Sequence, residues 1–365
     1  MSASGNWLNR RVESYKELSG RDRRRFWTDF LLNNAIYIIL AILVIYVQYY
    51  SVNVLRARNA FLSFNSIVDI LKKAAAALFL ALGVGGIIVL TGTDLSAGRI
   101  MGLSMLVSAS LLQKPFAEYA SKMYPNMPPW PIPVVIIFVM AFSALIGSFN
   151  GFCVAKFKLH PFIVTLATQL MLYGFILIYM TWGKNGGAPI AGLTEEYKNV
   201  VKGTFNIGKT AVPYYVVYAM IATAIMWYIW NKTTLGKNMY AVGANPVAAD
   251  ISGVSVMGTT VIVFTMAGAL YGFSGFVESA RVGSNSATAG LNAELDAIAA
   301  CVIGGVSFNG GLGKISGILL GVVMLQIITV ALQWLGVSTN LQYIIKGFII
   351  LVAVAIDMRK YVSKK

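Results

Sequence analysis

The sequence has few of the residues that carry enzymatic and metal chemistry. Of its 365 residues, one is histidine, two are cysteine and 14 are aspartate or glutamate. Cys153 and Cys301 each stand among apolar or small residues without a histidine or second cysteine nearby, so they predict packing residues and neither a disulfide nor a metal site. His160 precedes a proline at the start of an apolar run, where we expect it to begin a helix. The sequence therefore predicts no enzyme, no catalytic residue and no cofactor bound by this chain.

Charged residues are scarce as well, and their placement argues against nucleic acid as a partner. They make up 12% of the chain, against 57% hydrophobic residues and a mean hydropathy of +0.70. This composition is typical of a polytopic integral membrane protein, for which we expect an all-α fold. The net charge of +15 comes from basic residues at the ends of apolar runs and in the two tails, so a lipid membrane is the expected environment.

About ten apolar runs approach the length of roughly 20 residues that a helix needs to cross a bilayer. They lie near residues 31–50, 74–91, 98–113, 132–152, 161–181, 213–230, 257–279, 293–308, 315–335 and 341–357. We therefore predict one transmembrane domain at 31–358, between an N-terminal segment at 1–30 and a tail at 359–365. Because the first thirty residues are polar and include a cluster of arginines, no cleavable signal peptide is expected.

The basic residues are distributed unequally between the two sides of these runs. If the N-terminus is inside and the chain crosses the membrane ten times, seventeen of the 29 lysines and arginines fall on the inner side and eleven on the outer side. Connections rich in lysine and arginine stay in the cytoplasm. Both termini and the connection at 231–256 are therefore expected to be cytoplasmic.

One segment matches a nucleotide-binding pattern in the wrong context. Gly-Thr-Phe-Asn-Ile-Gly-Lys-Thr at 203–210 fits the phosphate-loop pattern GxxxxGK[ST]. A phosphate loop needs a buried parallel strand before it and a helix after it in a soluble α/β domain. This segment instead abuts an apolar run on the predicted outer side, so we do not expect Lys209 to bind ATP.

Two pairs of polar residues lie at the beginnings of apolar runs. Because an Asp, Arg or Lys at the bilayer centre costs about 2.5 to 3.5 kcal/mol, we expect such residues near an interface, in a cavity or beside a partner. Asp94 and Ser96 predict either caps of a helix that restarts after a break or a polar break that lines a permeation path. Glu294 and Asp296 predict either helix-start residues or a proton or cation relay.

Charged residues also mark the predicted outer side. Glu278 and Arg281 lie three residues apart on one helical face, so they predict an ion pair or a contact to a partner. The longest outer connection, at 182–212, carries Glu195 and Glu196 and is too short for a folded domain. Any function of this chain is therefore expected within the membrane or on short loops.

The polar connection at 234–253 predicts a short helix of its own. Asn245 can cap a helix whose first turn begins at Pro246, and Gly253 can end it. A short rigid helix that projects from a membrane domain is typical of a docking element.

Three long segments, in the same order along the chain, resemble the sugar permeases of ATP-binding-cassette importers. They are Thr-Gly-Thr-Asp-Leu-Ser-Ala-Gly-Arg at 91–99, the run from Asn-Lys-Thr-Thr-Leu-Gly-Lys-Asn at 231–238 into Ala-Val-Gly-Ala-Asn-Pro at 241–246, and Glu-Leu-Asp-Ala-Ile-Ala-Ala-Cys-Val-Ile-Gly-Gly-Val-Ser-Phe at 294–308. The resemblance covers the chain from about residue 60 onward. Within the family it is greatest to permeases for galactose and methyl-galactoside, with those for ribose next.

The resemblance implies a permease domain that moves a monosaccharide across a bacterial inner membrane by alternating access. It implies three protein partners: a second copy of the chain, a cytoplasmic ATPase that binds ATP, and a periplasmic or lipoprotein sugar-binding protein. The 234–253 connection becomes the coupling loop, and the residues assigned to ATPase docking are Gly236, Lys237, Gly243, Asn245, Pro246, Ala248, Ala249 and Gly253.

The remaining candidate residues follow from the same resemblance. Glu195, Glu196 and Arg281 become contacts for the sugar-binding protein. The candidates for the translocation path are Asp94, Ser96, Glu294 and Asp296. The alternative is an ion-coupled secondary sugar transporter, which would need indispensable ionisable groups at mid-membrane and no ATPase.

Overall fold

The structure is a computed structural model that describes residues 20–56, 60–115, 122–182, 186–208 and 210–362. The described helices and strands are α2 (Gly20–Asn53), α3 (Phe64–Val89), α4 (Ala97–Leu111), α5 (Ile132–Phe157), α6 (Pro161–Thr181), α7 (Glu195–Lys202), β1 (Thr204–Ile207), β2 (Thr210–Pro213), α8 (Tyr214–Lys232), α9 (Thr234–Ala244), α10 (Pro246–Ile251), α11 (Val256–Val282), α12 (Ala293–Ile303), α13 (Ile315–Trp334) and α14 (Thr339–Val362). Most of the predicted segment 1–30 lies outside the described residues. The fold is helical, as predicted, apart from one antiparallel hairpin of β1 and β2.

Each of the ten predicted apolar runs falls within or largely within a helix. Among the described residues, four helices are long and apolar enough to cross a membrane, namely α5, α6, α11 and α13. Shorter apolar stretches occur in α2, α4 and α14. The polytopic membrane class is thus confirmed, whereas the number of spans and the side of the termini stay predictions.

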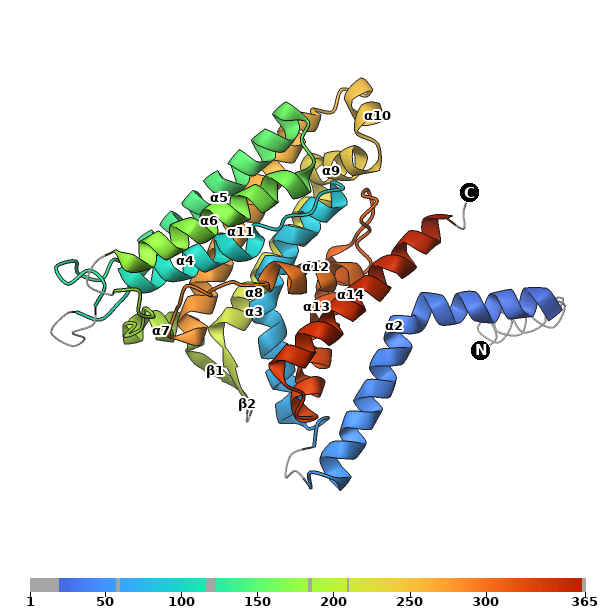
Figure 1. Ribbon diagram of the computed structural model, residues 1–365, viewed down its shortest axis with the longest axis horizontal. Coiled ribbons are helices and arrows are strands. Elements are labelled where there is room, and N and C mark those ends of the chain that lie inside the picture. The colour runs from blue at the N-terminus through green and yellow to red at the C-terminus, as the bar shows by residue number, and fades with distance from the viewer. Residues whose placement is uncertain (1–19, 57–59, 116–121, 183–185, 209, 363–365) are drawn as a thin grey trace.

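Helix α11 lies at the centre of the molecule and packs most extensively against α5, and next against α4 and α3 (Figure 1). Glycines allow the α5 contact to be very close. A Cβ atom added at Gly268 of α11 would lie 2.3 Å from the carbonyl oxygen of Ser143, and one at Gly147 of α5 would lie 2.2 Å from that of Phe264. Small residues at such positions let helices meet backbone to backbone where lipid gives them no hydrophobic reason to associate.

Two helices are too short to cross a bilayer and meet near their N-termini. The 15 residues of α4 span about 22 Å and the 11 residues of α12 about 16 Å at the α-helical rise. Gly98 of α4 packs against the backbone of Gly290, which precedes α12. The polypeptide therefore breaks twice within the helical body, at 90–96 and at 283–292.

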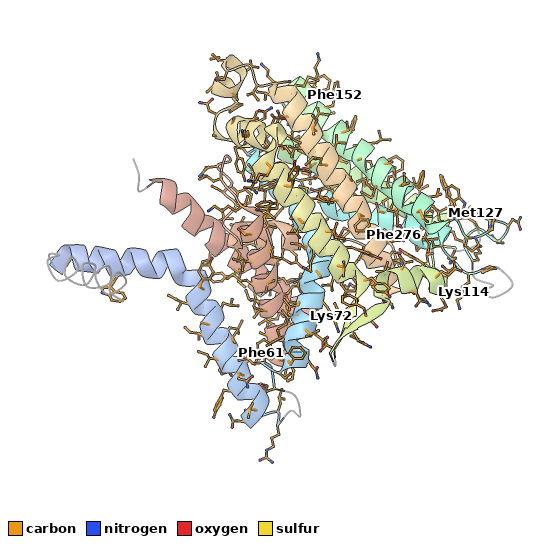
Figure 2. All side chains as sticks on the ribbon, turned by 180° about the vertical axis from the view of Figure 1, so that it is seen from behind. Phe61, Lys72, Lys114, Met127, Phe152 and Phe276 are labelled. Carbon is orange, nitrogen blue, oxygen red and sulfur yellow. The ribbon has the colours of Figure 1, made fainter. Side chains whose placement is uncertain are left out.

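Small elements cap the two ends of the helical body. Helices α9 and α10 lie at one end, whereas α7 and the hairpin lie at the other (Figure 1). In the opposite view, Phe152 marks the first end, and Lys114 and Met127 mark the second (Figure 2). Helix α2 bends sharply and stands beside α13, where Val47 of α2 and Phe61, which follows α2, cluster with Ala331. The chain thus offers two polar ends joined by an apolar middle.

Candidate functional site

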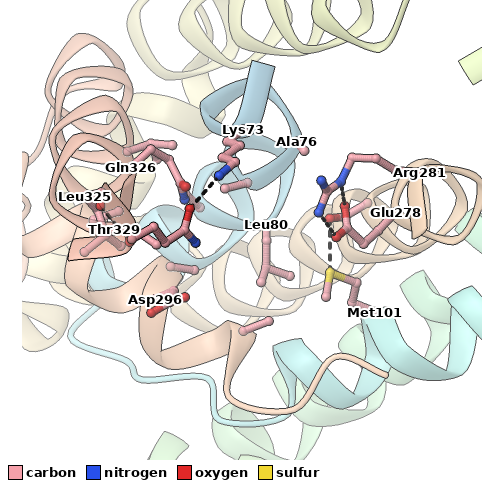
Figure 3. A pocket seen from close by; sticks show the side chains of 18 residues that line it. Lys73, Ala76, Leu80, Met101, Glu278, Arg281, Asp296, Leu325, Gln326 and Thr329 are labelled. Atoms are coloured by element: carbon pink, nitrogen blue, oxygen red, sulfur yellow. Dashed lines mark hydrogen bonds and ion pairs between the residues drawn. The ribbon is translucent and has the colours of Figure 1, made fainter. Parts of the chain in front are cut away.

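A cavity of about 310 Å³ lies between α3, α11, α12 and α13 (Figure 3). One part of its wall is apolar and includes Leu80, Met101 and Leu325. The polar lining residues are Lys73, Ser274, Glu278, Arg281, Asp296, Gln326, Thr329 and Gln333. The cavity therefore offers both hydrocarbon contact and hydrogen-bonding groups, as small-molecule sites do.

The charged groups of this cavity have partners within the chain. Arg281 donates from Nε to Glu278 Oε2 at 2.6 Å and from a terminal nitrogen to Glu278 Oε1, which confirms the predicted pairing. Lys73 Nζ donates to the Gln333 side-chain oxygen at 2.9 Å (Figure 3). Asp296 Oδ2 accepts from Lys346 Nζ of α14 at 2.8 Å. Two cations and two anions thus line one small space.

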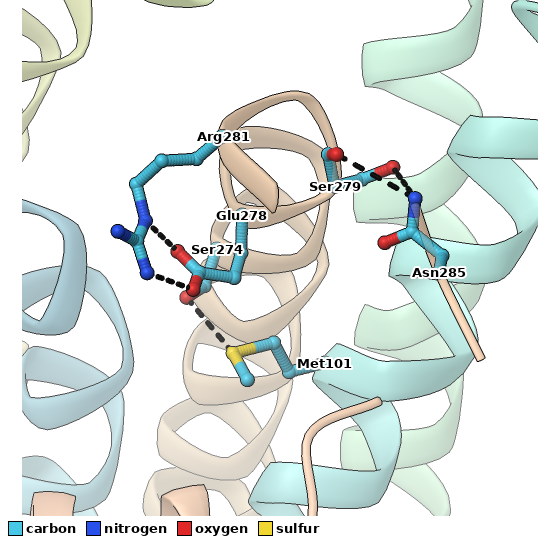
Figure 4. Close-up of polar contacts among 6 residues, drawn as sticks. All are labelled: Met101, Ser274, Glu278, Ser279, Arg281 and Asn285. Carbon is cyan, nitrogen blue, oxygen red and sulfur yellow. Dashed lines mark hydrogen bonds and ion pairs between the residues drawn. The ribbon is translucent and has the colours of Figure 1, made fainter. Parts of the chain in front are cut away.

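Contacts around the C-terminal end of α11 hold this wall in place (Figure 4). The Ser274 hydroxyl lies 3.3 Å from Met101 Sδ, which ties α11 to α4. Asn285, just after α11, donates from Nδ2 to the Ser279 hydroxyl at 3.1 Å, and its backbone pairs with Ile190 of the outer connection. The Glu278–Arg281 pair therefore stands on a helix end that is fixed from two sides.

A second polar group is buried inside the helical body and does not line the cavity. Asp94 Oδ1 accepts from the Ser96 backbone nitrogen at 2.9 Å and from the Ser96 hydroxyl at 2.6 Å. Asn150 of α5 donates to the Ser96 hydroxyl at 3.0 Å and accepts from Thr168 of α6 at 2.6 Å. Asp94, Ser96 and Asn150 have no solvent exposure. This cluster joins the break before α4 to two long helices.

The restart of a helix after Asp94 and Ser96 is confirmed, but the predicted capping role of Ser96 is wrong. Ser96 occupies the N-cap position of α4, yet its side chain makes no cap hydrogen bond, because its hydroxyl points to Asp94. Complete burial also keeps both residues out of the observed cavity.

The two acids of α12 occupy different environments. Glu294 is almost fully buried, and its Oε1 accepts from Gln169 of α6 at 3.3 Å. Its Oε2 would lie 1.9 Å from a Cβ atom at Gly98, so only glycine fits beside it. Asp296, two residues on, faces the cavity. Asp296 is thus the one path candidate that lines the cavity.

Arg99 lies close to the junction of the two short helices. Its guanidinium donates to the Ala287 carbonyl at 3.3 Å and stands over the Tyr173 ring at 4.5 Å. These contacts link α4 to the chain before α12 and to α6. In this region the sequence singled out Asp94, Ser96 and Glu294. It did not single out Asn150, Gln169 or Thr168, because these are uncharged polar residues within apolar runs and gave no signal of a site.

The predicted short helix of the 234–253 connection is confirmed as α10. Asn245 Oδ1 accepts from the Ala248 backbone nitrogen at 3.0 Å, Pro246 is the first helical residue, and Gly253 follows with φ +82°. A second helix, α9, precedes it and was not predicted. Thr233 caps α9 by accepting from the Gly236 nitrogen.

The residues assigned to docking divide into a buried set and an exposed set. Gly236 and Gly243 are buried against backbone, since a Cβ atom at Gly243 would lie 1.8 Å from the Val89 carbonyl oxygen, and Ala249 is buried too. The exposed set is Lys237, Asn245, Pro246, Ala248 and Gly253. Two apolar side chains of α10 are strongly exposed, Val247 at 68% and Ile251 at 83%. The buried set positions the element, and the exposed set is available to a partner.

The connection at 182–212, predicted to be on the outer side, forms α7, whose charged face is solvent-accessible. Glu195 is exposed and pairs with Lys198 at 2.9 Å and with Lys114 at 3.4 Å. The hydrogen bonds from these lysines lower the pKa of Glu195, so its carboxylate stays charged at neutral pH. Glu196 is exposed beside it. Burial raises the pKa of Tyr197, whose hydroxyl donates to the Phe276 carbonyl at 2.6 Å and anchors α7 on α11.

Two further sequence motifs have plain structural roles. The phosphate-loop pattern falls on the β1–β2 hairpin, with Gly208 at its turn and no helix directly after it; Lys209 lies outside the described residues. His160 is the N-cap of α6 and accepts from the Phe162 backbone nitrogen at 3.3 Å, as predicted for a helix-entry residue.

Comparison with known proteins identifies the family of this helical body. A family model described as branched-chain amino acid transport system / permease component matches residues 66–354. The chain belongs to this permease family. It is 43% identical over 338 residues to the galactose/methyl galactoside import permease of Haemophilus influenzae, covering 92% of this chain and 97% of that protein.

Two other relatives are similar over nearly their whole length. The galactose/methyl galactoside import permease of Escherichia coli is 40% identical over 348 residues, which cover 95% of this permease and 100% of the relative. The ribose import permease of Escherichia coli is 34% identical over 339 residues, which cover 93% and 97%. No solved structure was found to match. The permease is thus a multi-pass membrane transport subunit, and the family favours this over a secondary transporter.

Proposed function

We propose that the permease carries a monosaccharide through a bacterial cytoplasmic membrane as the transmembrane subunit of an ATP-binding-cassette importer. Galactose or a methyl-galactoside is the first candidate substrate and ribose the second, because relatives named as import permeases for these sugars align over nearly the whole chain. ATP would be bound and hydrolysed by a separate cytoplasmic ATPase.

The observation that carries the proposal is the exposed helix α10. It is capped at Asn245, stands at the end of the body between α8 and α11, and presents Val247 and Ile251 to solvent. Exposed apolar side chains on a rigid, capped element are typical of a protein contact. The buried glycines Gly236 and Gly243 would let the element follow the movement of the helices behind it.

Three more parts complete the proposed importer. A second copy of the chain would form the other half of the path. A periplasmic or lipoprotein binding protein would deliver sugar at the opposite end, where Glu195 and Glu196 are exposed and Arg281 lines the cavity. Asp296 would line the path directly. Asp94, Ser96 and Glu294 are buried, so they would line the path only when the two short helices, α4 and α12, move apart.

Reconstitution tests this function. The permease, the ATPase and the sugar-binding protein are placed together in proteoliposomes, and uptake of radiolabelled galactose is measured with and without ATP. We expect uptake only with all three proteins and ATP. Accumulation by the permease alone, under a proton or sodium gradient, would show a secondary transporter instead.

A further inference from the structure

We propose that the cavity between α3, α11, α12 and α13 is a binding station for a neutral sugar, and that Glu278 sets its selectivity by neutralising Arg281. This inference rests on the proposed function, since it names the substrate class of the same permease. Neither the family match nor the names of the relatives assigns this cavity or these two residues.

The size and lining of the cavity suit a single sugar ring. Its volume of about 310 Å³ is at the lower end of the range of about 300–1,000 Å³ for small-molecule sites. A pyranose has C–H faces that pack on apolar side chains, here Leu80, Met101 and Leu325, and a rim of hydroxyls that need donors and acceptors. Gln326 offers both from one amide, and among the described residues no hydrogen bond engages that amide.

Two cations, Lys73 and Arg281, and two anions, Glu278 and Asp296, line the cavity. Glu278 neutralises Arg281, whereas Asp296 is paired with Lys346, which does not line the cavity. The Arg281 guanidinium already donates two hydrogen bonds to Glu278, and the Lys73 ammonium donates one to the neutral side-chain amide of Gln333. A neutral sugar can enter without disturbing these bonds. A sugar acid would bring a carboxylate beside Glu278 and Asp296, whose cations are already bonded, so of the two lining cations only Lys73 is not paired with a carboxylate. The two existing carboxylates repel a third where little water screens the charges.

Glu278 controls this balance because of how it holds Arg281. The two residues lie three apart on α11, and both carboxylate oxygens bond to the guanidinium (Figure 4). Replacing Glu278 with glutamine keeps the shape of the side chain but removes its charge. The guanidinium is then free to receive a carboxylate with two parallel hydrogen bonds, which is the geometry that arginine prefers.

The first experiment compares a neutral sugar with its acid. The full-length permease is placed in nanodiscs without the sugar-binding protein, and saturation-transfer NMR measures binding of methyl galactoside and of galacturonate. We expect the wild type to bind methyl galactoside at least about tenfold more tightly than galacturonate, and the Glu278→Gln variant to reverse that order. An unchanged order in the variant would overturn the role of Glu278.

The Asp69→Asn variant is the matched control. Asp69 and Lys72 also form an acid–base pair three residues apart, with a distance of 3.5 Å, but neither lines the cavity. This variant removes one negative charge from the chain as Glu278→Gln does. We expect it to keep the wild-type order of the two ligands. A reversal in both variants would show a general charge effect and overturn the inference.

A second experiment tests the place of binding through volume. Ala77 is half-buried and lines the cavity, so Ala77→Leu adds bulk inside it. Ala224 is exposed on α8, and Ala224→Leu adds the same bulk outside it. We expect Ala77→Leu to weaken methyl galactoside binding about tenfold or more and Ala224→Leu to leave it unchanged. Equal binding by the two variants would place the sugar elsewhere.

Failure of this inference is distinguishable from failure of the proposed function. If wild-type uptake requires ATP and both partners, the importer function stands. If Ala77→Leu then transports galactose as fast as the wild type, only the binding station is refuted. If the wild type shows no ATP-dependent uptake with its partners, the proposed function itself fails.

Discussion

At the scale of single residues, Asn150 holds the buried cluster together. Its amide bonds to Ser96 on one side and to Thr168 on the other, at 3.0 and 2.6 Å, and so joins the start of α4 to α5 and α6. Polar groups at membrane depth have no water to replace a lost partner. The cluster therefore stabilises the break before α4 only while each bond is made.

We predict that Asn150→Leu lowers the midpoint of thermal unfolding, because it leaves two buried hydroxyls short of a partner, at a cost of about 1–3 kcal/mol. The measurement is the temperature at which the buried thiol of Cys301 reacts with a fluorescent maleimide, in a Cys153→Ser background. Asn231→Leu is the control, since Asn231 is exposed and bonds only to the Trp227 carbonyl. Equal midpoints for the two variants would contradict a stabilising role for the cluster.

At the scale of helices, the sequence predicted long elements well and short ones less well. Every apolar run lies in or largely in a helix, because hydrophobic length alone marks a membrane helix. Helix α9 was missed because it has no apolar run; it forms where Gly236 and Gly243 can lie directly on neighbouring backbone. Such contacts join residues far apart in the chain, so a single sequence does not indicate them.

Contacts between residues far apart in the chain also limit what the sequence predicts of the candidate site. Asp94 and Glu294 stood out because acids are rare in apolar runs, and both are indeed buried in polar clusters. The cavity was not predicted, because its wall combines residues of five helices, Met101 of α4 included, and depends on Lys73 and Gln326, which carry no motif. Among its lining residues, the sequence singled out Asp296, Glu278 and Arg281.

The close contact of α5 and α11 gives a second prediction. We expect Gly268→Ala to destabilise the permease by about 1–3 kcal/mol, because the added methyl group would overlap the Ser143 carbonyl. Gly174→Ala in α6 is the control, since nothing lies within 4 Å of its new Cβ atom, and alanine there should stabilise the helix by up to about 1 kcal/mol. The maleimide assay reports both midpoints; a Gly268→Ala midpoint at or above that of Gly174→Ala would refute the contact.

A third prediction concerns α10. Ile251 is 83% exposed on this helix, so it can be changed without disturbing the packing of the body. Ile251→Asp should reduce co-purification of the ATPase about tenfold or more while leaving the unfolding midpoint unchanged. Leu62→Asp, an exposed apolar residue at the opposite end of the body, should retain the ATPase. Normal ATPase recovery with Ile251→Asp would remove α10 from the interface.

At the scale of the whole molecule, the fold separates two functional ends. Helices α3 and α11 run the length of the body, so the end with α9 and α10 and the end with α7 and the hairpin are far apart (Figure 1). The cavity lies between these ends among α3, α11, α12 and α13, and the buried cluster joins the break before α4 to α5 and α6. A movement at the α10 end can therefore be transmitted to the middle of the permease through continuous helices.

The fourth prediction is that these ends lie on opposite sides of the membrane. A cysteine-free variant is made by replacing Cys153 and Cys301 with serine, and single cysteines are introduced at Val247 and Leu62, which are both exposed. In intact cells, a membrane-impermeant maleimide should label the Leu62→Cys protein, whereas the Val247→Cys protein should react only after the membrane is opened. Labelling of both from outside would refute the predicted orientation.

The backbone contact between α5 and α11 also limits how the permease can change shape. Where Gly147 and Gly268 bring two main chains together, the close backbone contact leaves no room for a larger side chain, so we expect this helix pair to act as a rigid strut. Alternating access then requires the strut to tilt as one piece, with deformation confined to the breaks at 90–96 and 283–292. Cross-linking α5 to α11 should therefore be tolerated during transport, while bridging those two breaks should stall it.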